Sequence, residues 1–123
     1  MSTKYCNPAV LDAALDEVTH ATEQHACSQM PESFAEVATY SLASVSLSSG
    51  DYSKSDGAVS GRRLTIAEQL GVPVTAEGTA THVALIDTLS NTLLYVTTSD
   101  PQGLTMGSYV DFPEWSIEIE NPQ

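Results

Sequence analysis

The clearest pattern of apolar positions runs through residues 78–87 and resumes over residues 93–98. Both stretches are rich in β-branched, aromatic and aliphatic residues, which favour strands. Side chains alternate between the faces of a strand, and both faces of the first stretch carry apolar groups: His82, Ala84 and Ile86 on one, Val83 and Leu85 on the other. The pattern predicts a central strand covered on both sides. Asp87 and the Ser90-Asn91 pair supply the turn of a hairpin.

A helical period appears near the N-terminus, where apolar residues recur at Leu11, Ala14, Leu15 and Val18. Asn7 suits the N-cap, and Pro8 suits the first helical position. We expect one amphipathic helix over residues 8–21, within a helical segment of residues 7–22. Residues 1–6 would form a flexible N-terminal arm.

The rest of the chain, residues 23–120, reads as a β domain. Further short strands are expected at residues 24–28, 42–48, 61–67, 104–112 with an interruption near Gly107, and 115–120. Residues 72–74 form a short run whose proline suits a sheet edge, residues 33–37 a helical turn, and residues 48–57 and 101–103 loops. The fold class is therefore mainly β with an N-terminal α-helix. The expected architecture is an antiparallel β-sandwich or partly open barrel of about six or seven strands. A chain of 123 residues predicts a single domain over residues 1–123.

Charge changes the picture most, because sixteen acidic residues against four basic ones give a net charge of −12. The basic residues are Lys4, Lys54, Arg62 and Arg63. Nucleic-acid binding needs a basic surface, so we expect no nucleic-acid partner. The acidity is explained by solubility, by a partner with a basic surface, or by clustered carboxylates that hold Ca²⁺. No apolar run is long enough to span a membrane, so no membrane association is expected.

Residue chemistry indicates no reaction, and we expect neither an enzyme, a cofactor nor a metal site. Cys6 and Cys27 do not match a zinc signature and are expected to be free thiols. His20 and His25 are five residues apart and do not share a helix face. His82 is expected to be a core or inter-strand residue, with catalysis or pH sensing as the alternatives. The sequence contains no G-x-S-x-G elbow and no phosphate-binding glycine motif.

Several stretches carry a resemblance: Gly78-Thr79-Ala80-Thr81-His82-Val83-Ala84-Leu85-Ile86-Asp87, Leu93-Leu94-Tyr95, Leu104-Thr105-Met106-Gly107, Phe112-Pro113-Glu114-Trp115-Ser116-Ile117, and Leu11-Asp12-Ala13-Ala14-Leu15 near the start. In these stretches the chain resembles a group of small structural proteins of tailed bacteriophages. The resemblance spans most of the chain, and its motifs are packing motifs. It implies a virion component that is made in the host cytoplasm, assembles in many copies and catalyses no reaction.

The function expected from this resemblance is that of a capsid decoration or cement protein on the outer shell. Its partners would be the major capsid protein or other virion proteins, and it would be a homo-oligomer within the assembly. The alternatives are a neck, tail or fibre-attachment protein and, in another class, a carbohydrate-binding adhesin module whose exposed tyrosines, Tyr52 and Tyr109, stack on sugar rings.

The expected interface comprises Lys4, Tyr5, Asp51, Tyr52, Lys54, Asp56, Arg62 and Arg63. The adjacent arginines would point to opposite faces of a strand. They would either pair with acidic residues of the same chain or anchor the protein to an acidic neighbour.

Overall fold

A computed structural model describes residues 6–58 and 60–120 and shows a mainly β protein with two α-helices. The elements follow one another as α1 (Pro8–Val18), β1 (Glu23–Cys27), α2 (Phe34–Tyr40), β2 (Ser41–Ser46), the 3-10 turn η1 (Ser49–Asp51), β3 (Tyr52–Asp56), β4 (Arg62–Ile66), β5 (Gln69–Pro73), β6 (Gly78–Asp87), β7 (Thr92–Leu104), β8 (Tyr109–Phe112) and β9 (Trp115–Ile119). These nine strands exceed the expected six or seven.

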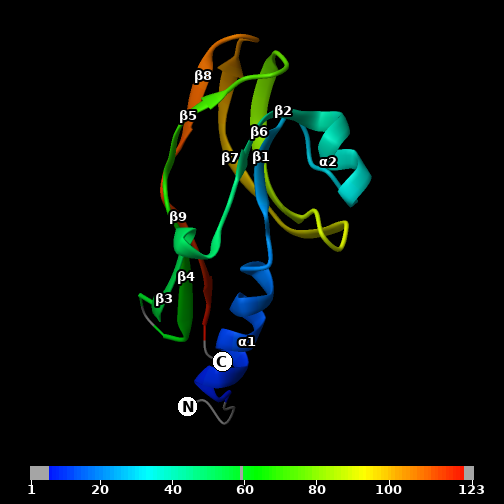
Figure 1. Cartoon of the computed structure of the whole chain (residues 1–123). Coiled ribbons are helices and arrows are strands. Elements are labelled where there is room, and N and C mark those ends of the chain that lie inside the picture. The colour runs from blue at the N-terminus through cyan, green and yellow to red at the C-terminus, as the bar shows by residue number, and fades with distance from the viewer. Residues whose placement is uncertain (1–5, 59, 121–123) are drawn as a thin grey trace.

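The strands form three antiparallel sheets with the orders β2-β1-β6-β7, β3-β4-β9 and β5-β8. Figure 1 shows the four-stranded sheet on one side and the two smaller sheets end to end on the other, since β4 leads into β5 and β8 into β9. Helix α2 lies beside the four-stranded sheet, and α1 extends from its lower end. A single bridge between Ala43 and Val74 links β2 to the chain beyond β5.

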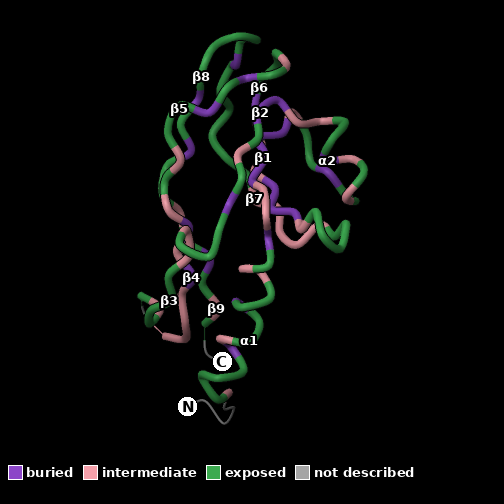
Figure 2. The backbone as a smooth tube through the Cα atoms, viewed as in Figure 1, coloured by how far each residue is buried: buried purple, intermediate pink, exposed green. Residues whose placement is uncertain are grey.

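Strand β6 is central and covered on both sides, as its sequence predicts. It pairs with β1 on one edge and β7 on the other. Ala84 and Ile86 pack with Val37 of α2, whereas Leu85 belongs to the cluster that contains Leu64 of β4. Buried residues accordingly gather along the middle strands, and exposed ones dominate α1 and the outer loops (Figure 2).

The hairpin between β6 and β7 closes where the sequence predicts. Asp87 accepts a hydrogen bond from the Leu89 N–H at 2.9 Å and another from the Ser90 hydroxyl at 2.9 Å. Asn91 adopts the left-handed conformation with φ of 54°, which asparagine tolerates better than most residues.

The N-terminal helix begins at Pro8 as expected but ends at Val18, not at residue 21. Asn7 caps its start by accepting a hydrogen bond from the Ala9 N–H at 2.8 Å. At the other end, Ala21 is buried and the Thr22 N–H donates to the Ile86 carbonyl at 2.8 Å. Pairing with the sheet therefore removes these residues from the helix. Helix α2 is longer than the expected single turn.

The polar segment at residues 48–57 was expected to be a loop, but it forms η1 and β3. Its register with β4 runs from Tyr52 opposite Ile66 to Asp56 opposite Arg62. Four of the five β3 residues are exposed because β3 is an edge strand that faces solvent. Such a strand needs little apolar alternation, which is why its sequence resembles a loop.

The expected loop at residues 101–103 is also wrong, because β7 continues through it to Leu104. Gly78 pairs with Leu104 and Ala80 with Gln102, so the long strand is supported by its partner. The interruption expected near Gly107 in the strand over residues 104–112 is confirmed, because a turn in which Gly107 has a φ of +88° separates the end of β7 from β8. Only its second half is the separate strand β8.

Candidate interaction surfaces

The interface residues expected from the sequence fall in one region. Asp51, Tyr52, Lys54, Asp56, Arg62 and Arg63 all lie in η1 or the β3–β4 hairpin. Lys4 and Tyr5 lie outside the described residues. The structure thus brings six residues together on one small sheet and the turn that precedes it, at the end of the molecule where α1 lies (Figure 1).

The cations of this hairpin pair with acidic residues of the same chain. Lys54 Nζ lies 2.6 Å from Asp16 Oδ1 of α1. Arg62 bridges two acids, with Nε 2.7 Å from Asp12 Oδ1 and Nη1 2.7 Å from Asp56 Oδ1. The hydrogen bonds to Asp12 and then to Asp56 raise the pKa of the Arg62 guanidinium further.

These contacts give Lys54 and Arg62 a structural role, because they fasten α1 to the small sheet. Arg63 differs from them, since its Nε donates to Glu118 Oε1 of β9 at 2.7 Å and stays within the sheet. In the structure, the basic residues of this hairpin are therefore paired with acidic residues of the same chain. Whether the same side chains also contact a partner stays a prediction.

Tyr52 and Asp51 are held by the fold. The Tyr52 hydroxyl donates to the Ala21 carbonyl at 2.8 Å, and burial raises the pKa of this phenol to about 12. Asp51 accepts a hydrogen bond from the Ser48 N–H at 2.8 Å, which lowers the pKa of its carboxyl. Tyr52 is half-buried and packs against the cluster that contains Leu64, so less of its ring is available for sugar stacking than the adhesin alternative assumes. Tyr109, by contrast, is 72% exposed.

A second surface lies on the two-stranded sheet β5–β8. Leu70 of β5, Tyr109 of β8 and Met106 of the preceding turn are the large exposed apolar residues of this region. Pro73 pairs with Tyr109 in the register of the sheet and is also exposed.

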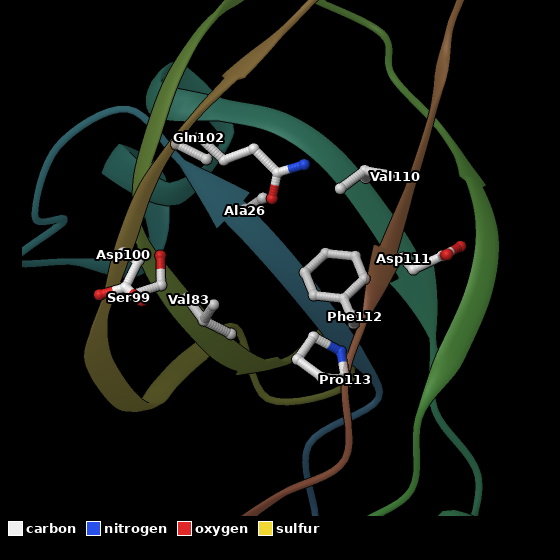
Figure 3. Close-up of a pocket in the computed structure, with 10 residues that line it drawn as sticks. Ala26, Val83, Ser99, Asp100, Gln102, Val110, Asp111, Phe112 and Pro113 are labelled. Carbon is white, nitrogen blue, oxygen red and sulfur yellow. The ribbon is translucent and has the colours of Figure 1, made fainter.

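A groove runs between β7 and the β8–β9 segment. It consists of two cavities of about 230 and 320 Å³, and we call their combination the β7–β8 groove. Both cavities are lined by Val83, Ser99, Phe112 and Pro113. In Figure 3 Phe112 and Pro113 form one wall, Val83 lies opposite them, and the Gln102 amide points into the space.

The lower end of the groove is formed by the single tryptophan of the chain, Trp115. Its indole Nε1–H donates to Gln24 Oε1 of β1 at 2.7 Å, and its ring centroid lies 6.0 Å from that of Tyr95. These contacts fix the ring while leaving it partly exposed to the groove.

A hydrogen-bonded row of Ser41, His25 and Glu23 lies elsewhere on the four-stranded sheet. Ser41 Oγ is 2.7 Å from His25 Nδ1, and His25 Nε2 is 2.8 Å from Glu23 Oε1. These residue types occur in serine hydrolases, and only the fold brings them together. None of the cavities described here is lined by these residues, and His25 is only 8% exposed. Its hydrogen bonds join Ser41 at the start of β2 to β1.

The cysteines and His82 also have reactive side chains. Both Cys6 and Cys27 are free, and burial raises the pKa of the Cys27 thiol to about 11. His82 is partly buried in β6, and its Nδ1 lies 2.8 Å from Oγ1 of the neighbouring Thr81 in the same strand. Within residues 6–58 and 60–120, no three metal-ligating side chains gather into a potential ion site.

Comparison with protein-family models, with curated proteins and with solved structures gave no match in any of the three. Neither helix of the described part of the chain has the length and apolar character needed to cross a membrane.

Proposed function

We propose that this protein is a structural component of a tailed-bacteriophage particle, in the form of a decoration or cement protein on the outer capsid surface. The proposal is carried by the resemblance in residues 78–87, which form the central strand β6. All three hydrophobic clusters include residues of this strand: Ala80, Ala84, Leu85 and Ile86. The resemblance therefore lies in residues that build the scaffold.

The distribution of charge supports an attachment protein that does not bind the genome. Three of the four basic residues, Lys54, Arg62 and Arg63, are engaged in ion pairs, and the net charge is −12. Such a surface repels phosphate and favours partners with basic patches. A ligand that binds only the assembled shell would stabilise that shell by mass action.

For the finer architecture, we propose a partly open barrel. The order β7-β6-β1-β2 continues to β5-β8 through the bridge between Ala43 and Val74. The β7–β8 groove then marks the side on which the barrel stays open. A strand arrangement of this kind is rigid and leaves strand edges for contacts with neighbours.

The decisive experiment measures the number of copies per purified particle and the thermal stability of particles with and without the protein. We expect many copies, comparable to the number of capsid subunits or capsomers, and a lower disruption temperature when the protein is missing. A dozen copies or fewer would favour the neck, tail or fibre-attachment alternative. Absence from particles would overturn the proposal.

The adhesin alternative is supported by one observation, the exposed ring of Tyr109 beside Pro73. A glycan-array screen tests it with the wild type and with Tyr109→Ala. Binding to a sugar that the substitution abolishes would favour the adhesin alternative. An array without any binding would contradict that alternative.

A further inference from the structure

The β7–β8 groove has the chemistry of a site for a cationic side chain. Its floor and walls are apolar and aromatic: Ala26, Ala80, Val83, Val110, Phe112 and Trp115. Its rim is polar, and no lysine, arginine or histidine lines either cavity. An arginine or lysine side chain has the same division, with an aliphatic stem and a charged head.

Charge at the rim favours a positive occupant. Asp100 lines the groove and is exposed, and among the described residues neither its carboxylate nor the Gln102 amide has a hydrogen-bond or ion-pair partner. Asp111 differs, because its carboxylate accepts a hydrogen bond from the Gly71 N–H at 2.8 Å and points away from the cavity (Figure 3). The paired cations of the chain lie in the β3–β4 hairpin, at the other end of the molecule (Figure 1).

The partly exposed ring of Trp115 adds a further reason. A guanidinium over a tryptophan face is attracted by the ring electrons, and tryptophan is the best aromatic partner for this contact. The ring is held by Gln24 and Tyr95, so the site is already formed without an occupant. A site formed in advance loses less conformational entropy on binding.

The backbone around the groove argues against simple addition of a strand. The register between β6 and β7 shifts between Ala80 and His82, so that Ser99, Asp100 and Pro101 bulge from the strand. Pro101 in β7 and Pro113 after β8 both lack an N–H, and bulges and prolines on edge strands oppose continuous pairing. Recognition at this groove must therefore depend mainly on side chains.

We propose that the β7–β8 groove docks an extended basic segment of a partner protein, which inserts one arginine side chain beside Asp100 in the first cavity and another against Trp115 in the second, on either side of Phe112. This proposal goes beyond the placement of the protein in a particle. Binding of a peptide in solution and location in a particle are measured separately, so either can fail without the other.

The test uses the intrinsic fluorescence of Trp115, which is the only tryptophan of the chain. The probe is a capped peptide of alternating valine and arginine, and the matched control replaces each arginine by the neutral isostere citrulline. The arginine peptide should change the fluorescence with saturation, and the citrulline peptide should bind at least about tenfold more weakly. Equal binding of both peptides, or no binding of either, would overturn the proposal.

Two substitutions separate the groove from the general negative charge of the protein. Asp100→Asn should weaken binding of the arginine peptide about threefold, which is the effect expected for an exposed ion pair. Glu68→Gln removes one exposed charge outside the groove and should change the affinity for this peptide little. Ser99→Phe places a large ring at an exposed position that lines both cavities and should reduce binding about tenfold or more. Equal effects of Asp100→Asn and Glu68→Gln would show non-specific attraction. A groove closed by a second copy in solution, detected as a dimer that Ser99→Phe dissociates, would also contradict the proposal.

Discussion

Trp115 and Gln24 join the two layers of the molecule through one partly buried hydrogen bond of 2.7 Å from the indole Nε1–H to the amide Oε1. Gln24 is fully buried, and its Nε2 has no partner within the described structure. The pair therefore combines one satisfied contact with one unsatisfied donor. Removing only Trp115 leaves the buried Gln24 amide without its partner, which costs more than replacing both residues by apolar groups.

Substitution of this pair gives the first prediction. Trp115→Phe should lower the free energy of unfolding by about 1–3 kcal/mol, because Gln24 then loses its only side-chain hydrogen bond. The double variant Trp115→Phe with Gln24→Leu should recover part of this loss. Denaturant unfolding of the two single variants and the double variant measures the coupling. Strictly additive losses would contradict the prediction.

The covered strand β6 gives the second prediction. Leu85 is fully buried between the layers, so Leu85→Ala should lower the free energy of unfolding by about 2–5 kcal/mol. The matched control is Leu89→Ala in the hairpin turn, where the side chain is 89% exposed. It should change stability by less than about 0.5 kcal/mol in thermal or denaturant unfolding. Similar effects at both positions would mean that β6 is not doubly covered.

The Tyr52 phenol makes stability fall at alkaline pH. Its pKa is raised to about 12 in the folded chain, above the ordinary value of 10.0. The contribution of the protonated Tyr52 phenol to the free energy of unfolding is complete below the pKa of the unfolded chain. It is lost as the pH rises from about 10 towards 12, since only the unfolded chain ionises in that range. Tyr52→Phe should lose about 1 kcal/mol at neutral pH with the hydrogen bond to Ala21, and it should show a weaker alkaline decline. An unchanged alkaline decline in that variant would contradict the assignment.

The ion pairs between α1 and the small sheet give the fourth prediction. Arg62→Gln removes both the Asp12 and the Asp56 contact, so the amides of α1 should exchange with solvent faster. Arg63→Gln is the matched control, because Arg63 pairs with Glu118 inside the sheet and does not contact α1. Hydrogen exchange followed by mass spectrometry compares the two variants. Equal protection of α1 in both would show that Leu11 and Leu15 hold the helix without help from charge.

The elements with a strong local signal in the sequence were predicted correctly. The start of α1 at Pro8 follows from the Asn7 cap, and β6 follows from apolar residues on both faces. The strand β3 was missed because its exposed polar residues carry no periodic signal. The continuation of β7 through Pro101 was missed because proline and glycine commonly end strands, and here pairing with β6 outweighs that tendency.

The interaction surfaces were harder to predict, because they combine residues that lie far apart in the sequence. The adjacent arginines were recognised as candidates for pairing with acids, but their partners Asp12 and Glu118 lie about fifty residues away, as the separations of 50 and 55 show. The groove unites Val83, Ser99 and Phe112 from three strands, and no segment of the sequence contains that combination. The sequence signals this groove only through its single tryptophan, Trp115.

Imaging of particles purified from cells that produce this chain tests the central claim, that the protein is a structural component attached to the outside of a shell. The account predicts repeated density of this elongated shape across the outer capsid surface, in contact with major-capsid subunits. Density confined to the neck or tail, or particles without the protein, would contradict it.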